Sequence, residues 1–149
     1  YDVYGFFPKM LNTDVAAAMG LVQLKKLQDL QARRKALWEQ YTRVFTTEAW
    51  AIDWIEPPPG PEVYERHSYF TYQIKLNYGS RDLLAKFLRE RGIYTNLRYH
   101  PLHLNPAYGS RDRLVNCERL NATALNLPLH PRLREEEVDY VLDTLKAFL

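Results

Sequence analysis

Residues 12–47, which read NTDVAAAMGLVQLKKLQDLQARRKALWEQYTRVFTT, contain no proline and carry the longest helical pattern in the sequence. Their apolar side chains recur every three or four residues, as in a helix with one buried stripe. The stripe comprises Val15, Met19, Val22, Leu27, Leu30, Leu37, Tyr41 and Val44. Thr13 or Asp14 is a suitable N-cap. An unbroken helix of this length would extend about 50 Å, so we expect a bend near residues 25–29 and two consecutive helices.

The two halves of this stretch predict different surroundings. Residues 16–20, AAAMG, are small and mostly apolar on every side, so we expect them to pack against another helix or another subunit. Residues 26–47 carry a charged and polar face and should lie on the surface of the domain. The side chains expected to point inward are Leu30, Leu37, Trp38, Tyr41 and Phe45.

Length and composition favour a single globular domain. The chain has 149 residues, 46% of them hydrophobic, and its 20 basic and 18 acidic residues leave a net charge of +2. This balance argues against a surface for nucleic acid or membrane. Cys117 is the single cysteine, which excludes an internal disulfide and fits a reducing compartment. With no signal peptide and no apolar run of about 18 residues, we expect a cytoplasmic protein.

The start of the chain suggests a missing part. The first residues, YDVYGFFPKML, are rich in aromatic side chains and begin without methionine. Such side chains on a loop need cover from this domain, from another domain or from a partner subunit. We therefore expect a fragment or a processed product.

The remaining sequence predicts short strands between helices. We expect strands at residues 51–55, 69–77 and 94–99, a short extended piece at 127–129, and helices at 81–91, 112–125 and 135–149. The apolar stripe expected on the last helix comprises Val138, Val141, Leu142, Leu145 and Phe148. The proline-rich residues 56–61 should form a stiff surface connection. This order predicts an α+β fold, in which a small sheet of about three strands is covered by helices.

The pentapeptide YGSRD occurs twice, at residues 78–82 and 108–112. Both copies precede a predicted helix, so we expect Ser80 and Ser110 to be N-caps. An alternative is a pair of anion sites built from helix N–H groups with Arg81 or Arg111.

Residues that commonly carry catalysis or bind metals form no complete set. The histidines are His67, His100, His103 and His130. With Cys117 they match no zinc-finger spacing, so we expect no metal site. Cys117 falls on an apolar helical stripe and is expected to be a small buried thiol.

The densest polar cluster is RYHPLH at residues 98–103, on a loop directly after a predicted strand. Loops in this position often hold binding residues. Arg98, Tyr99 and His103 offer a cation, a phenol and an imidazole, which suit a sugar or a phosphate. The alternative is a proline-rich turn with a structural histidine.

Four segments together resemble the second half of the DegT/DnrJ/EryC1/StrS family of pyridoxal-phosphate-dependent (PLP-dependent) sugar aminotransferases. They are NTDVAAAMGLVQLKKL, RHSYFTYQIKL, RDLLAKFLRERGIYTNLRYHPLHLNPAY and LNLPLHPRLREEEVDYVLDTL, in that order along the chain. The resemblance implies the C-terminal small domain of a fold-type I PLP enzyme. Residues 1–12 would be a cofactor and dimer-contact loop, 13–48 a bent helix linking the domains, and 49–149 the small domain.

The resemblance also implies a reaction. Such enzymes move an amino group from glutamate to a keto nucleotide-sugar, in the biosynthesis of cell-surface polysaccharides or secondary-metabolite sugars. Their cofactor lysine lies in a serine-x-x-x-x-lysine stretch before GEGG, and neither motif occurs here. We therefore expect no catalytic residue in this chain and no activity from it alone.

The resemblance assigns binding roles as well. It implies a homodimer in which the loop before the Ala-rich helix reaches the cofactor phosphate of the partner subunit, with Lys9 and Asn12 as candidates. His103 corresponds to the PLH histidine and would line the sugar pocket, and His67 would be structural. Where the family often caps the last helix with Ser or Thr, this chain has Arg134, at a cost of about 1 kcal/mol.

Two other functions remain open from the sequence. One is a non-catalytic α+β module that binds a ligand or dimerises. The other is a PLP-dependent sugar dehydratase relative, in which another residue replaces the cofactor lysine.

Overall fold

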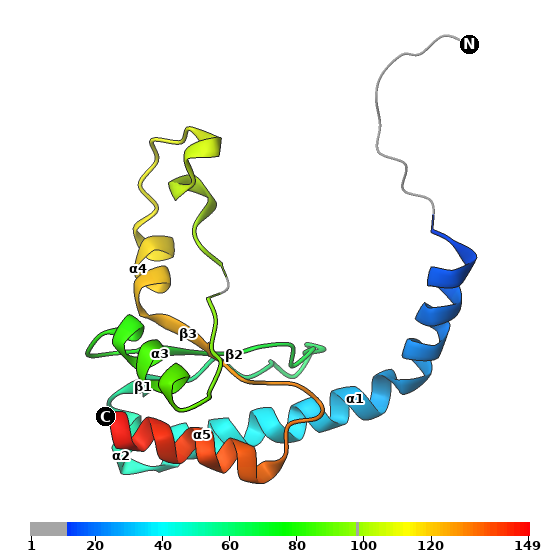
Figure 1. Ribbon diagram of the computed structural model, residues 1–149, viewed down its shortest axis with the longest axis horizontal. Helices are drawn as coiled ribbons and strands as arrows, with labels where there is room; N and C mark the ends of the chain where they lie inside the picture. Colours follow the sequence, from blue (N-terminus) through cyan, green and yellow to red (C-terminus); the bar gives the residue numbers. More distant parts are fainter. Residues whose placement is uncertain (1–11, 98) are drawn as a thin grey trace.

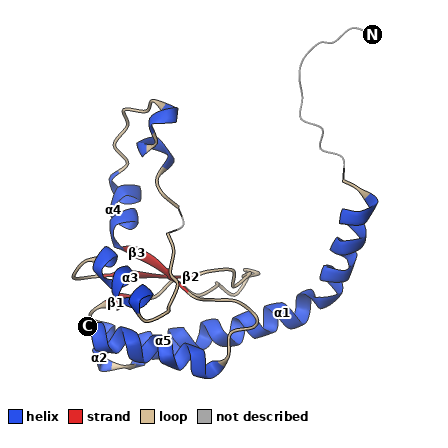
Figure 2. Cartoon of the chain, viewed as in Figure 1, coloured by secondary structure: helices blue, strands red, loops and turns tan. Residues whose placement is uncertain are grey.

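The computed structural model describes residues 12–97 and 99–149. The expected loop over residues 1–11, with Lys9, and the candidate Arg98 lie outside the described residues. The elements, drawn in Figures 1 and 2, are α1 (Asp14–Thr47), α2 (Ala49–Ile52), β1 (Ile55–Glu56), β2 (Tyr72–Leu76), α3 (Arg81–Glu90), the 3₁₀ turns η1 (Leu102–Leu104) and η2 (Pro106–Tyr108), α4 (Val115–Thr123), β3 (Ala124–Leu127) and α5 (Glu135–Phe148).

The sheet is antiparallel with the strand order β1-β2-β3, which confirms the α+β class. Ile74 of β2 pairs with Leu125 of β3, and Leu76 pairs with Ile55 of β1. Along β2, burial alternates, as expected for a strand with one face against a core. Tyr72, Ile74 and Leu76 are buried on that face, while Gln73 and Lys75 alternate with them and are half-buried.

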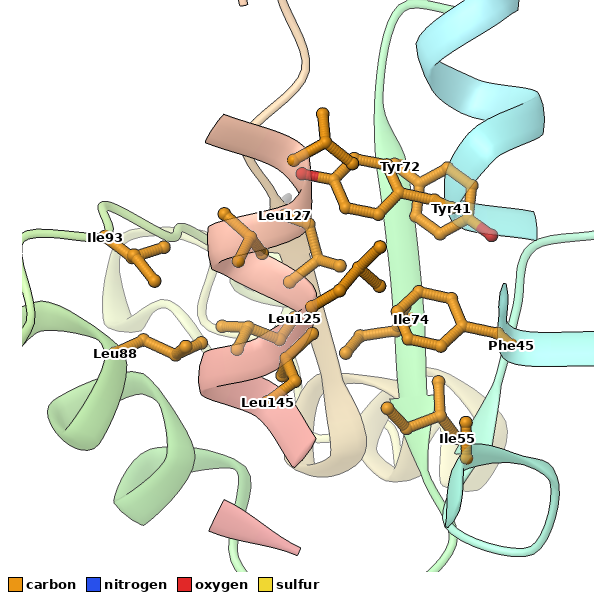
Figure 3. Close-up of a cluster of buried hydrophobic side chains, with 14 of the residues drawn as sticks. Tyr41, Phe45, Ile55, Tyr72, Ile74, Leu88, Ile93, Leu125, Leu127 and Leu145 are labelled. Atoms are coloured by element: carbon orange, nitrogen blue, oxygen red, sulfur yellow. The ribbon is translucent and has the colours of Figure 1, made fainter. Parts of the chain in front are cut away.

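The core lies between the sheet and helices α1, α3 and α5, and Figure 3 shows its two parts. On one side, the ring of Tyr72 contacts Tyr41 and Phe45 of α1, with ring centroids 5.0 and 6.0 Å away. The other side is aliphatic and comprises Leu88, Ile93, Leu125, Leu127 and Leu145. The predicted stripe of the last helix is confirmed: Val138, Val141, Leu142 and Leu145 are buried, and Phe148 is half-buried.

Helix α1 is one continuous helix of 34 residues, so the prediction of two consecutive helices was wrong. No proline interrupts its hydrogen bonds, and Figure 1 shows that the helix curves along its length. Thr13 is the N-cap: its hydroxyl accepts a hydrogen bond from the backbone N–H of Ala16 at 3.2 Å.

Only the second half of α1 packs on the domain. Leu37, Trp38, Tyr41 and Phe45 are buried, as predicted from the sequence. Every residue from 12 to 29 is exposed. The exposed large apolar side chains of this half are Val15, Met19, Leu21, Val22, Leu24 and Leu27. In Figure 1 this half projects away from the sheet.

Several predicted strands and helices differ from the structure. Residues 51–55 were expected to form a strand, but they contribute to α2 and only the first residue of β1. Where a strand was expected at 94–99, the described residues of this range, 94–97 and 99, contain only a single bridge, between Asn96 and Asn126. The helix expected at 112–125 is shorter, because Ala124 already belongs to β3 and pairs with Lys75. The extended piece is therefore β3 at residues 124–127, which overlaps the expected 127–129 only at Leu127.

The two YGSRD copies share a backbone feature but form different structures. Gly79 and Gly109 both have positive φ, at 78° and 57°, a conformation that glycine adopts without steric cost. Ser80 caps α3, because its Oγ accepts from the N–H of Leu83 at 3.3 Å. Ser110 instead accepts from the N–H of Asp112, and α4 begins only at residue 115, so Ser110 is not the predicted helix cap.

The N-cap of helix α5 is Arg134, which has no capping hydroxyl, as the sequence indicates. Its first turn is nevertheless closed by Glu137, whose Oε2 accepts from the backbone N–H of Arg134 at 2.8 Å. The other carboxylate oxygen lies 3.2 Å from the Arg134 guanidinium. Glu137 thus supplies one half of a capping box, which offsets part of the expected loss.

Among residues 12–97 and 99–149, no helix is long and apolar enough to cross a membrane.

Candidate functional site

The candidate site residues lie on an arm, which we define as residues 99–123, containing η1, η2 and α4. Figure 1 shows the arm projecting from the sheet, in the yellow-green part of the chain. Asn105 caps η2 by accepting from the N–H of Ala107 at 3.0 Å. Asn96, which lies just before the arm in the sequence, exchanges two backbone hydrogen bonds with Asn126 of β3, just after the arm. No residue of α4 is buried, so apolar packing contributes little to the arm's conformation.

His103 contacts a carboxylate of α4. Its Nε2 lies 3.1 Å from Oε1 of Glu118, and the imidazole side chain is only 7% exposed. The same Oε1 accepts from the backbone N–H of Leu114 at 2.9 Å. The hydrogen bond from His103 lowers the pKa of Glu118 below its usual value, with smaller contributions from Leu114 and Arg113.

Tyr99 lines a small pocket of about 130 Å³ that residues of α4 also line. Cys117 and Asn121 of α4 line this pocket together with Gln73 of β2. The structure therefore brings Tyr99 and His103 against the same helix, while Arg98 lies outside the described residues. Cys117 is exposed, so its predicted burial was wrong. The reason is that α4 does not join the core.

Asn12 is exposed and directly precedes Thr13, the N-cap of α1. The Thr13 hydroxyl is occupied by the cap, whereas an exposed amide can bind a ligand. An amide at the start of a helix suits an anion such as a phosphate. In Figure 1 the first turns of α1 and the arm lie on opposite sides of the chain.

His67 packs in an aromatic group beside α1. Its ring centroid lies 4.6 Å from Tyr69 and 5.8 Å from Trp38, both edge-on. Its Nδ1 accepts from the backbone N–H of Tyr69, which has a positive φ of 48°. These contacts agree with a structural histidine.

Sequence reasoning missed a larger polar pocket, of about 480 Å³, between β1, β2 and α4. Its charged residues are Glu56, Lys75 and Arg119, of which Lys75 is paired with Glu56. These residues are far apart in the sequence and share no motif, so no sequence pattern predicts the pocket. Among the described residues, no group of three or more His, Cys, Asp or Glu side chains could hold a metal ion.

Comparison with known proteins places this geometry in a family. A curated relative from Saccharopolyspora spinosa, dTDP-4-dehydro-2,3,6-trideoxy-D-glucose 4-aminotransferase, is 37% identical over 135 residues. That alignment covers 91% of this chain but 34% of the relative. The chain thus spans about a third of the length of this relative.

Solved structures share the fold. The aminotransferase TlmJ from Streptoalloteichus hindustanus superposes with a TM-score of 0.88 at 35% identity, covering 98% of this chain and 39% of that one. The PLP form of the putative sugar aminotransferase Spr1654 from Streptococcus pneumoniae has a TM-score of 0.81 at 30% identity, covering 91% and 35%. The predicted similarity to a fold-type I small domain is thereby confirmed.

The DegT/DnrJ/EryC1/StrS aminotransferase family matches residues 1–146. Since this is nearly the whole sequence, the chain belongs to the DegT/DnrJ/EryC1/StrS aminotransferase family.

Proposed function

We propose that this chain is the C-terminal part of a PLP-dependent aminotransferase that transfers an amino group from glutamate to a keto nucleotide-sugar. The observation that carries the proposal is the family match over residues 1–146, supported by the close superposition on TlmJ. The relative from S. spinosa is named for a dTDP-linked keto sugar, which favours a substrate of this kind.

The chain contributes binding surfaces to this enzyme, and its lysines do not hold the cofactor. When bound, PLP supplies the electron sink for amino-group transfer. The lysine that holds such a cofactor is normally activated by burial or a nearby charge. In the described part of the chain no lysine is buried, and Lys75 is paired with Glu56. Without the rest of the enzyme, the 149 residues are inactive under this proposal.

The two candidate groups of binding residues have separate roles in a homodimer. Asn12, with Lys9, binds the phosphate of the PLP held by the partner subunit, and the exposed amide of Asn12 suits that contact. Arg98, Tyr99 and His103 belong to the sugar site. The exposed apolar half of α1 is the surface that the rest of the enzyme or the partner covers, since so large an apolar surface favours association.

A substrate panel tests the proposal. The full-length protein is incubated with PLP, glutamate and keto nucleotide-sugars, beginning with dTDP-4-dehydro-2,3,6-trideoxy-D-glucose, and 2-oxoglutarate is measured. We expect 2-oxoglutarate and an amino sugar to form in equal amounts. Loss of water from the sugar without transfer would indicate a dehydratase instead. Absence of PLP binding would indicate a non-catalytic module.

A further inference from the structure

Few apolar contacts fix the conformation of the arm. Its large apolar side chains are mostly exposed, including Tyr99, Leu102, Leu104, Tyr108, Leu114 and Val115. No residue of α4 is buried among the described residues. Because little apolar surface is removed from water here, polar contacts must contribute much of what fixes this segment.

Glu118 makes the most connected of these polar contacts. Its Oε1 accepts from His103 Nε2 at 3.1 Å and from the N–H of Leu114 at 2.9 Å. Leu114 is the N-cap residue of α4 and has no side-chain cap of its own. One carboxylate oxygen therefore joins the η1 turn, the start of α4 and the body of α4. Hydrogen bonds to an ionised acceptor are stronger than neutral ones.

The position of Glu118 in α4 links this contact to the Tyr99 pocket. Cys117 and Asn121, which line the pocket, lie one residue before and three residues after Glu118. If α4 shifted relative to η1, these side chains would move relative to Tyr99. The Glu118 side chain itself is not part of the pocket lining.

We infer that Glu118 is a positioning residue: by holding His103 and the start of α4, it sets the arm in the geometry that the sugar site requires. The link to the sugar rests on the proposed function, whereas the holding of His103 does not. In this arrangement Glu118 does not contact the substrate, and His103 Nε2 is occupied by Glu118. The remaining nitrogen of His103, Nδ1, is the one left to face a ligand.

Chemical modification of the histidines tests the holding of His103. Diethyl pyrocarbonate reacts with accessible imidazole nitrogens, and peptide mass spectrometry separates His103 from the exposed His100, which is an internal reference. In the unsubstituted protein His103 should react more slowly than His100. Glu118→Ala should raise the His103 rate at least about tenfold, because a hydrogen bond to a charged group is lost.

Two further variants distinguish the hydrogen bond between Glu118 and His103 from the negative charge of a glutamate as such. Glu118→Gln keeps an acceptor oxygen for His103 and Leu114, so its His103 rate should stay within about threefold of the unsubstituted protein. Glu136→Ala removes a glutamate from the first turn of α5 and should leave the His103 rate unchanged. Equal His103 rates in Glu118→Ala and Glu136→Ala would overturn the inference, and so would a His103 as reactive as His100 before substitution.

Kinetics then test the positioning. In the full-length enzyme, Glu118→Ala should raise KM for the keto nucleotide-sugar about tenfold. The reaction with glutamate alone should stay unchanged. In Glu118→Gln, KM for the sugar should be close to that of the unsubstituted enzyme. Unchanged KM in an active Glu118→Ala enzyme would overturn the positioning role. If the full-length protein shows no aminotransferase activity, the proposed function fails, and the modification experiment still decides whether Glu118 holds His103.

Discussion

The hydroxyl of Tyr41, in the buried half of α1, donates a hydrogen bond to the carbonyl oxygen of Pro128 at 3.1 Å. Tyr41 is fully buried, and its ring also contacts Tyr72 of β2. Burial raises the pKa of Tyr41 far above its usual value, with a smaller contribution from Tyr72, so the phenol stays protonated and remains a donor. The long helix is thus joined directly to the segment that follows β3.

Removing this hydroxyl should destabilise the domain. Tyr41→Phe leaves the Pro128 carbonyl without its donor in a partly buried position, at a cost of about 1–3 kcal/mol in the free energy of unfolding. Urea unfolding monitored by circular dichroism measures the change. Tyr140→Phe is the matched control: Tyr140 donates to the carbonyl of Arg91, but its side chain is exposed and water can replace it. Equal losses in the two variants would contradict this account.

The repeated pentapeptide offers a matched pair of cap variants. Ser80→Ala should reduce the free energy of unfolding by about 1 kcal/mol, because the N–H of Leu83 loses its acceptor. Ser110→Ala should change it by less than about 0.5 kcal/mol, because Ser110 caps no helix and is exposed. Thermal unfolding of both variants measures the difference. A larger effect at Ser110 would mean that the second copy is structurally the more important one.

Two leucines of α1 should differ sharply. Leu37→Ala creates a cavity in the core and should cost about 2–5 kcal/mol in the free energy of unfolding. Leu24 is 63% exposed, so Leu24→Ala should change the stability of the isolated chain by less than about 0.5 kcal/mol. Urea unfolding measures both values. A large loss in Leu24→Ala would show that the first half of α1 is already packed within the chain.

The ionised carboxylate of Glu137 should contribute to the free energy of unfolding, and this contribution should be lost at acid pH. The backbone N–H of Arg134, and then its guanidinium, hold the pKa of Glu137 below its usual value. A carboxylate with a lowered pKa in the folded state stabilises the fold above the unfolded pKa. This contribution is lost as the pH falls below about 4.5 and through the folded pKa.

The variant Glu137→Gln should therefore lose less stability between pH 7 and pH 3 than the unsubstituted chain. The measurement is the melting temperature across that range, by circular dichroism. Glu136→Gln is the control, because it removes a charge from the same turn but Glu136 makes no hydrogen bond to Arg134. An identical pH profile for the unsubstituted chain and Glu137→Gln would exclude this contribution.

Asn12 and Lys9 should affect cofactor binding in the full-length enzyme. Asn12→Ala and Lys9→Ala should each weaken PLP binding about tenfold, as expected when a contact to a phosphate is lost. Absorbance titration with PLP measures the dissociation constant. Lys26→Ala, on the exposed part of α1, is the control and should leave it unchanged. A residue whose variant binds PLP normally is not part of the phosphate site.

Local patterns predicted the helices well where one face is buried. The stripe of α5 and the inward residues of α1 from Leu37 to Phe45 are buried as expected, and α3 begins at its predicted cap. Strand prediction was poorer. Ala124 and Leu125 were assigned to a helix, and of the residues in β3 only Leu127 was expected to be extended, yet all four are buried in this strand. Their conformation depends on pairing with β2, about fifty residues earlier in the chain.

The candidate site was predicted only as a list of residue types. The sequence pointed to Tyr99 and His103, and the structure brings both against α4. The sequence did not indicate Glu118, because nothing in a helix of ordinary composition distinguishes a glutamate that contacts a distant histidine. The sequence also predicted that Cys117 is buried, because it falls on an apolar stripe, but this stripe of α4 does not pack against the core.

The sequence by itself determined the α+β class, the family and the position of most helices, because helical periodicity, caps and motifs are local properties of the chain. Tertiary structure alone decided which extended segments pair, which half of α1 is covered, and which carboxylate meets His103. These depend on contacts between residues far apart in the sequence, and local periodicity contains no information about such partners.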